Sequence, residues 1–433
     1  MDSNTLIAAL AEGDDAEFAR LLDRVPDEEL VGPEGTALLE AAARARRAEA
    51  VWELVNLRGV DAARPWTGGV DPVGWAAEHG LVDVLHSLLD GTGKSLVLHR
   101  RALRVAKAAL AADPCGPQAH RGVVSMLEFD LGLFCEPAEL VARALVHADP
   151  DHADWNESLL VIARRADREL LAWACARVLD APSLAARRFA LDALLHLGIG
   201  SNFLDGSDGE DDGTEFADAA VTFLEPLLDT EQDPYALKTV LHGLDMHNWH
   251  NHRAALPHLE HPDATVRSAA VIATAGALAH PAPELDQDLA AALLRRAADL
   301  DPEVRRVTAS AFTGALAHRS AADVDPRILA AVLRLADDPA AAVRAAATYA
   351  LYRSGLDTPA LRAALTGRLD DAEVDIDVRI QAAGALAVRG DLRGRGVLDE
   401  ISRGLTGHRS PGHGMMGDVQ HMLRIYASSD SGE

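Results

Sequence analysis

The chain has 433 residues, of which 48% are hydrophobic but only 4% aromatic. At about 150 residues per domain this length allows roughly three domains, and the apolar content excludes wholesale disorder. With 41 basic against 67 acidic side chains, the formal net charge is −26. So acidic a chain repels phosphate groups, which argues against general nucleic-acid binding and against docking on anionic membranes.

The N-terminal segment 1–94 carries a helix-pair pattern that recurs about every 33 residues. Its clearest copy, residues 59–89, reads GVDAARPWTGGVDPVGWAAEHGLVDVLHSLL. Asp71-Pro72 begins a first helix, Gly80 follows it, and an apolar second helix comes next. Weaker copies begin near residues 5 and 35, and Gly13 precedes Gly80 by two such periods. These residues resemble ankyrin repeats, although Val73-Gly74 follows the proline where that family has histidine.

A different repeat occupies the C-terminal half of the chain. A Val-Arg pair follows an Asp- or Pro-containing turn and opens an Ala-rich helix in four copies, spaced by 38, 39 and 35 residues: Val266-Arg267, Val304-Arg305, Val343-Arg344 and Val378-Arg379. Two degenerate copies precede them, with second helices expected near 183–197 and 234–246. The pattern resembles HEAT repeats. This resemblance implies that Asp and Arg side chains, such as Asp263 with Arg267 and Asp338 with Arg344, form a structural ladder in which each repeat's arginine meets an aspartate.

The sequence therefore divides into three segments. Residues 1–94 are predicted as ankyrin-like repeats and 95–165 as an irregular helical connector, either tetratricopeptide-like or degenerate HEAT-like. Residues 166–433 are predicted as HEAT-like repeats with an acidic insertion at 201–213 and a C-terminal capping helix over 418–426. Each helix pair is too small to bury its own apolar face, so neighbouring pairs stack. No stretch alternates apolar and polar residues as strands do. We predict an all-α fold, an α-solenoid of stacked helix pairs.

Cysteine usage and the N-terminal residues bear on location. Cys115, Cys135 and Cys175 form no Cys-x-x-Cys pair, so we expect buried structural thiols in a reducing compartment. The start, Met1-Asp2-Ser3-Asn4, lacks the basic and apolar run of a signal peptide. These features predict a cytoplasmic protein. The excess of arginine over lysine and the alanine-rich helices suggest a high-GC bacterial genome.

Two segments contain potential metal ligands. His247, His250 and His252 lie in a histidine-rich turn, and Asp208, Glu210 and Asp212 match the first ligand positions of a calcium loop. The twelfth position of that loop should be glutamate and is Ala219. We predict a solvated or partner-contacting turn and a mobile acidic loop, with no metal and no other cofactor.

Enzymes built on helical repeats are disfavoured. Deoxyhypusine hydroxylase holds iron with His-Glu pairs, and this sequence contains no His-Glu dipeptide. HEAT-like alkylpurine DNA glycosylases use a basic face with tryptophan, and Trp155, Trp173 and Trp249 are available, but the net charge of −26 opposes DNA. A metal-dependent or nucleic-acid-modifying enzyme is retained only as the weakest alternative. We predict that the chain is not an enzyme.

The sequence favours a non-catalytic scaffold or adaptor that grips a protein partner, and the acidic surplus favours a basic one. The alternative is an immunity protein that neutralises a toxin, and the oligomeric state is left open. Trp66 and Thr67, at the tip of the turn 65–69, are the first predicted contacts because an exposed tryptophan is a preferred anchor. Trp75 is predicted to be buried. The remaining predicted contacts are Trp249, His250 and Arg253.

Overall fold

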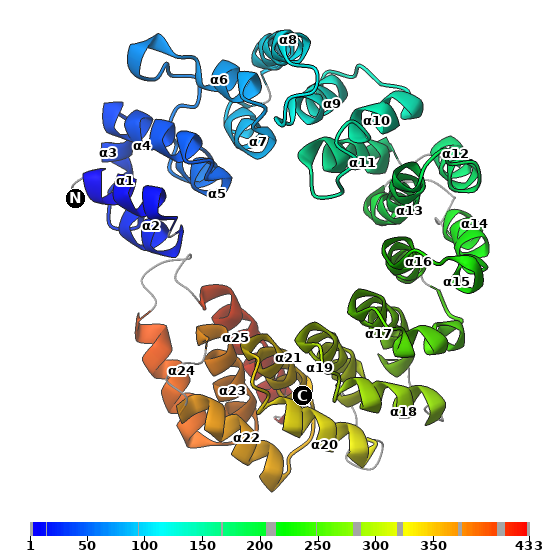
Figure 1. Ribbon diagram of the computed structural model, residues 1–433. Coiled ribbons are helices and arrows are strands. Elements are labelled where there is room, and N and C mark those ends of the chain that lie inside the picture. Colours follow the sequence, from blue (N-terminus) through cyan, green and yellow to red (C-terminus); the bar gives the residue numbers. More distant parts are fainter. Residues whose placement is uncertain are drawn as a thin grey trace. The chain divides into compact units, whose positions relative to one another are not determined.

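A computed structural model of the chain describes residues 3–13, 15–93, 95–165, 168–204, 214–247, 249–279, 287–317, 324–370, 375–404 and 412–430. The chain forms two compact units, Met1–Gly213 (unit 1) and Thr214–Glu433 (unit 2). Figure 1 shows that the described parts of both are stacks of helices. The predicted all-α solenoid is confirmed. The three-segment division by repeat type stays a prediction.

Unit 1 consists of helix pairs joined by short turns. In chain order its helices are α1 (Ser3–Glu12), α2 (Asp15–Leu22), α3 (Asp27–Leu30), α4 (Pro33–Arg44), α5 (Ala48–Trp52) with η1 (Glu53–Leu57), η2 (Thr67–Gly69), α6 (Pro72–Glu78), α7 (Val82–Asp90), α8 (Leu96–Ala112), α9 (His120–Asp130), α10 (Pro137–Ala144), α11 (Ala153–Arg165), α12 (Arg168–Leu179) and α13 (Leu184–Leu204).

The expected period near 33 residues is visible in the backbone of unit 1. In the first three pairs, the turn between the two helices contains one residue with positive φ: Gly13 at 81°, Arg46 at 58° and Gly80 at 65°. This left-handed conformation costs glycine little, whereas Arg46 adopts it against its side chain's preference. Three successive turns thus share one geometry, which aligns the helices that follow them.

The second helices of successive pairs pack side by side and form one layer of unit 1. In this layer α5 contacts α7, and α9 contacts α11, which contacts α13. The first helices form the other layer, in which α6 packs against α8. Leu39, Leu54, Leu85 and Leu88 are fully buried between the two layers. One face of each second helix is therefore free to line a surface.

Unit 2 repeats the same two-layer plan. Its helices are α14 (Thr214–Leu224), α15 (Leu227–Thr230), α16 (Pro234–Met246), η3 (His252–Glu260), α17 (Ala264–Ala279), α18 (Gln287–Arg296), α19 (Pro302–Leu316), α20 (Pro326–Leu335), α21 (Ala341–Arg353), α22 (Pro359–Asp370), α23 (Ile376–Val388), α24 (Leu392–Gly404) and α25 (His413–Asp430). Helices α16, α17, α19, α21, α23 and α25 pack in succession as one layer.

Asp-Pro turns start several of these helices. The carboxylate of Asp301 accepts hydrogen bonds from the backbone N–H groups of Glu303 and Val304, and Asp233 and Asp325 cap α16 and α20 in the same way. Proline in the first helical turn costs nothing there, because its missing N–H would have had no partner. The helices predicted to begin just before each Val-Arg pair are confirmed.

The predicted arginine–aspartate ladder is present between consecutive repeats. Arg267 makes a two-pronged contact with Asp299 at 2.8 and 2.9 Å, and Arg305 makes the same contact with Asp338 at 2.7 and 2.9 Å. Each aspartate comes from the next repeat rather than from the turn before the arginine. Arg344 donates to the carbonyls of Asp338 and Pro339, which repeats the backbone contacts of Arg305. The ladder therefore fixes the repeat-to-repeat stacking.

Several smaller expectations are corrected by the structure. Residues 201–204 belong to α13, so the predicted acidic insertion starts too early. Helix α25 is longer than the expected 418–426. None of the three cysteines is fully buried: Cys115 and Cys135 lie in turns between helices, Cys175 lies on a partly exposed face of α12, and Cys115 is exposed. Burial still raises the pKa of the Cys135 and Cys175 thiols to about 11.

The described residues form no strand, and their one β-bridge joins Ala317 to Ser354. None of their helices combines the length and apolar character needed to cross a membrane.

Candidate functional site

A groove lies on the second-helix layer of unit 1. It has a volume of about 380 Å³, and we call it the α5–α7–α11 groove after the helices that line it. A second hollow of about 430 Å³ shares His86 and Arg164 with it, so the two form one continuous surface. The groove is lined by Ala48, Glu49, Trp52, Val82, Asp83, His86, Ser87, Glu157, Leu160 and Arg164.

One wall of the groove is made by equivalent positions of two consecutive repeats. Glu49 and Asp83 are 34 residues apart, as are Trp52 and His86, and the same interval separates the positive-φ residues Arg46 and Gly80. Residues three apart on a helix share a face. The repeat therefore presents one carboxylate and one ring from each second helix to the same surface.

The groove and its adjoining hollow carry a strong excess of negative charge. One guanidinium, that of Arg164, lies among the lining residues, and it stands over the Phe129 ring at 5.4 Å and 4.0 Å from Asp130. The carboxylates of Glu49 and Asp83 make no hydrogen bond or ion pair with any described residue. The five lining carboxylates are those of Glu49, Asp83, Asp90, Asp130 and Glu157.

Glu157 is the most deeply buried of these carboxylates. Only 9% of the residue is exposed, and burial raises the pKa of its carboxyl to about 7, while the charges of Asp83 and Asp130 push it in the same direction and Arg164 opposes them. A buried acid without a compensating cation is costly. A positive group entering the groove would remove that cost, so Glu157 marks a place suited to a cation.

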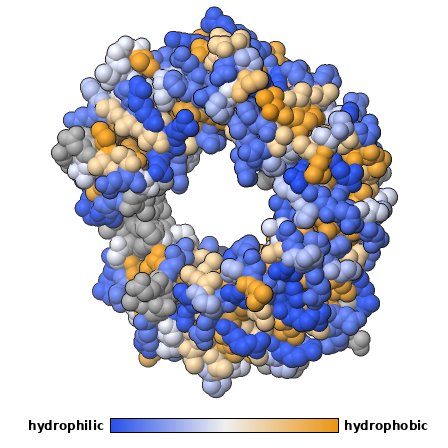
Figure 2. All heavy atoms as spheres, viewed as in Figure 1, coloured by the Kyte–Doolittle hydropathy of each residue, from blue (hydrophilic) through white to orange (hydrophobic). Residues whose placement is uncertain are grey.

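Apolar side chains border the acidic lining. Trp52 is 40% exposed and Leu160 37% exposed, on opposite sides of the groove, and Leu96 borders the adjoining hollow. On the face shown in Figure 2, hydrophobic residues occur in small separate patches within a mostly hydrophilic surface. The combination of an exposed indole and unpaired carboxylates is suited to long cationic side chains, which have an apolar stem and a charged tip.

The structure reverses the expectations for Trp66 and Trp75. Trp66 is only 3% exposed, whereas Trp75 is half-buried. Gly68 and Gly69 have positive φ, and the turn closes through a 2.8 Å hydrogen bond from the Trp66 N–H to the Val70 carbonyl. The indole of Trp66 therefore folds back onto its own repeat, 5.3 Å from the Trp75 ring. The predicted exposure of Trp66 at a projecting tip is wrong. Trp66 was predicted to contact a partner because of that exposure, so this prediction is no longer supported.

Trp249, a second predicted contact, is only 4% exposed, with its ring edge-on to His252. It packs beneath the histidine-rich turn instead of projecting from it. Thr67, His250 and Arg253 are exposed, so their predicted role in partner binding stays a prediction.

The candidate metal ligands of the sequence are not gathered into a site. His247 is buried, His250 is exposed, and the Nδ1–H of His252 donates to the Ala273 carbonyl at 2.9 Å. Within the described part of the chain these three histidines do not form a cluster with ligand atoms close enough for one ion. Asp208, Glu210 and Asp212 lie outside the described residues.

Sequence reasoning missed the groove, although one signal was present. Trp52 interrupts the apolar face of its helix, since Val51 and Leu54 are fully buried and Trp52 is not. Its repeat equivalent, His86, is likewise exposed. Glu157 could not be found in this way. It lies in the predicted connector 95–165, where the sequence does not show which positions of successive repeats are equivalent.

The fold and the groove define a class: the chain is an α-helical repeat protein with an acidic surface groove. No family model matches the chain, and no curated protein matches it in sequence. Among solved structures, YibA of Escherichia coli has a TM-score of 0.43 and 15% identity over 67% of this chain and 93% of its own.

Two karyopherin structures are also similar. Kap121p, bound to the extreme C-terminus of the protein phosphatase Cdc14p, has a TM-score of 0.41 and 10% identity over 98% of this chain and 53% of its own. Kap95p, solved with RanGDP, has a TM-score of 0.42 and 11% identity over 98% of this chain and 67% of its own. This chain thus spans about half the length of Kap121p. Similarity at this level carries no argument about what the chain binds.

Proposed function

We propose that the chain is a non-catalytic binding protein that holds a cationic segment of a protein partner in the α5–α7–α11 groove. The observation that carries the proposal is the unpaired, partly buried negative charge of the groove lining. The carboxylates of Glu49, Asp83 and Glu157 make no ion pair or hydrogen bond with any described residue. Carboxylates placed this way favour association with lysine or arginine over neutral or acidic segments.

Each part of the lining has a distinct role in this proposal. Glu157 lies deepest and ionises fully once a cation is beside it, because an opposite charge offsets its burial. Asp83 and Glu49 attract the approaching segment from the rim. The Trp52 ring offers a flat face on which a guanidinium or a lysine stem can stack.

The assignment of the repeats to the ankyrin and HEAT families, the bacterial source and the cytoplasmic location belong to the same proposal, and they rest on the sequence patterns. A repeat stack suits this role because each repeat adds side chains to one extended surface.

The test is a direct binding measurement with a defined probe. We expect a short fluorescent peptide of arginine and leucine to bind the full chain, and the same peptide with glutamate in place of arginine not to bind. Asp83→Lys should weaken binding more than about ten-fold, or roughly 1.4 kcal/mol. Glu28→Lys is the matched control, because Glu28 is exposed on α3 outside the groove and the change in net charge is identical.

Two outcomes would contradict the proposal. The first is that the arginine peptide does not bind at low salt. The second is that Asp83→Lys and Glu28→Lys weaken peptide binding equally. In the second case the net charge of the chain, and not the groove, would be responsible.

A further inference from the structure

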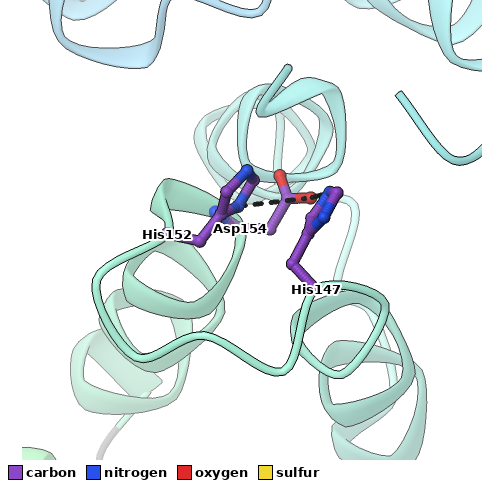
Figure 3. Close-up of side chains that lie close together, drawn as sticks. All are labelled: His147, His152 and Asp154. Carbon is purple, nitrogen blue, oxygen red and sulfur yellow. Dashed lines mark hydrogen bonds and ion pairs between the residues drawn. The ribbon is translucent and has the colours of Figure 1, made fainter. Parts of the chain in front are cut away.

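Two histidines and one aspartate meet where helix α11 begins. His147 lies in the turn that follows α10, His152 lies just before α11, and Asp154 lies in the first turn of that helix. Figure 3 shows the carboxylate close to both imidazoles, whose ring centroids are 4.0 Å apart. One potential ligand atom from each side chain lies within 4.8 Å of the other two, the only such group of three among the described residues.

Two polar atoms of this cluster are buried without a hydrogen-bond partner. Asp154 is fully buried, and its Oδ2 accepts no hydrogen bond from any described residue; Nε2 of His147 is likewise without a partner. These two atoms are 3.7 Å apart, which is too long for a hydrogen bond. Buried polar atoms normally have partners. An ion between the two would satisfy both.

The other atoms of the cluster are already fixed by the backbone. The Gly122 N–H donates to Oδ1 of Asp154 at 2.6 Å, which orients the carboxylate and leaves Oδ2 free. Nε2 of His152 lies 3.2 Å from the Pro117 carbonyl, to which it donates, so Nδ1 keeps its lone pair. Hydrogen bonds of this kind orient the ligands of protein metal sites.

The spacing and the donor set fit a transition metal. Oδ2 of Asp154 lies 3.7 Å from His147 Nε2 and 3.8 Å from His152 Nδ1, against about 3.4 Å between ligands of a tetrahedral zinc ion with bonds of about 2.0–2.1 Å. Binding of an ion therefore requires the three side chains to draw closer and the two rings, inclined at 31° to each other, to turn their lone pairs towards one point. Nδ1 of His152 also accepts the Asp154 N–H at 3.1 Å, and that N–H can lose this partner because it lies in the first helical turn.

We propose that His147 Nε2, His152 Nδ1 and Asp154 Oδ2 bind one divalent first-row transition-metal ion, zinc being the best fit, with a fourth position open to water. Two imidazoles and one carboxylate are typical ligands of such ions. The imidazole side chains are 18% and 17% exposed, which gives the ion a route to the buried carboxylate. Ala148, at φ 53°, turns the chain directly after His147 and directs it back towards α11.

His261, outside the cluster, shows that a histidine can accept a backbone N–H at the start of a helix without two further ligands beside it. Nδ1 of His261 accepts the Asp263 N–H at 3.1 Å, as His152 does for Asp154. Asp263, however, is partly exposed and caps its own helix through Thr265. No second histidine completes a three-ligand group there among the described residues. His261 is therefore a control histidine, which lies at the start of a helix but has no three-ligand group around it.

The experiment is calorimetric titration of zinc chloride into the untagged full chain after treatment with a chelator. We expect one ion per chain, and more than ten-fold weaker binding in each of His147→Ala and Asp154→Asn. His261→Ala should bind as the parent does. Zinc should also raise the melting temperature of the parent and of His261→Ala, but not that of the two ligand variants. Cobalt substitution should give the strong visible absorption of a four-coordinate ion.

The proposal is overturned if the parent shows no saturable binding, or if both ligand variants bind zinc like the parent, because the ion would then lie elsewhere. Circular dichroism without zinc checks that each variant folds. His147→Ala carries the test if Asp154→Asn does not fold, since the His147 ring is partly exposed. Binding of the arginine peptide is measured separately on chelator-treated protein, so failure of the groove proposal and failure of the metal proposal are distinguishable.

Discussion

The ladder of unit 2 and the groove of unit 1 use their carboxylates in opposite ways. In unit 2, Arg267 and Arg305 form ion pairs with aspartates of the next repeat. The hydrogen bonds from Arg305, together with its charge, lower the pKa of Asp338 although this residue is buried. In the groove of unit 1, Asp83 and Glu157 have no such partner, and burial raises the pKa of Glu157. Paired carboxylates stabilise the stack, whereas unpaired ones in a hollow are available to another molecule.

Tryptophan side chains also join repeats in unit 1. Five of the six tryptophans lie in unit 1. The Arg44 guanidinium stands 5.8 Å from the Trp66 ring and 5.2 Å from the Trp75 ring, so an arginine and two indoles join consecutive repeats there. In the ladder of unit 2 the same role falls to ion pairs. Substitutions can therefore weaken one unit without the other.

Trp66→Ala should have the largest effect. It removes an almost fully buried indole and should lower the free energy of unfolding of unit 1 by about 3–5 kcal/mol. Because the tryptophans are concentrated in unit 1, fluorescence mainly follows the unfolding of that unit, and its transition should shift to lower urea. The part of the circular dichroism transition that comes from unit 2 should stay at the same urea concentration. Trp52→Ala is the control, because its ring is 40% exposed. Coincident shifts by both probes would show that the units do not unfold separately.

Arg305→Met should destabilise unit 2 by about 3 kcal/mol, since Asp338 keeps its buried charge and loses its main partner. The change should appear in circular dichroism more than in tryptophan fluorescence, the reverse of Trp66→Ala. Adding Asp338→Asn should recover part of the loss. A cost below about 1 kcal/mol, the range of exposed ion pairs, would mean that the ladder contributes little and that apolar packing alone joins these repeats.

Glu157→Gln should stabilise unit 1 at alkaline pH. The pKa of Glu157 is about 7 in the folded chain against an ordinary value of 4.5, so the folded state binds the proton more tightly. Stability is then lost as pH rises from about 4.5 through 7. The glutamine variant escapes this loss and should exceed the parent by about 2–3 kcal/mol at pH 8, but not at pH 4.

Urea unfolding at the two pH values measures this difference. Glu49→Gln serves as the control, because Glu49 is exposed and its replacement should change stability by less than about 0.5 kcal/mol at either pH. Equal pH dependence of parent and Glu157→Gln would show that the Glu157 carboxyl titrates normally.

The repeat pattern predicted the helices well, because it depends on local rules. Asp-Pro turns, Val-Arg pairs and recurring glycines act within a few residues, and Asp301 and Gly80 do in the structure what the sequence indicates. The site was not predictable in the same way. Exposure of Trp66 depends on how its turn folds back onto Trp75. The groove depends on bringing Asp83 near Glu157, which are 74 residues apart.

Trp52→Ala should have the smallest effect on stability and a clear effect on binding. Its ring is exposed, so truncation should change the free energy of unfolding by less than about 1 kcal/mol. If cationic side chains stack on this indole, affinity for the arginine–leucine peptide should fall about ten-fold. Leu179→Ala, an exposed apolar truncation on α12 outside the groove, should bind the peptide as the parent does. Equal affinity of Trp52→Ala and the parent would leave the carboxylates as the sole contacts, and binding should then disappear at high salt. Residual binding at high salt that depends on Trp52 would instead show that the repeat supplies both the charge and the apolar surface of the groove.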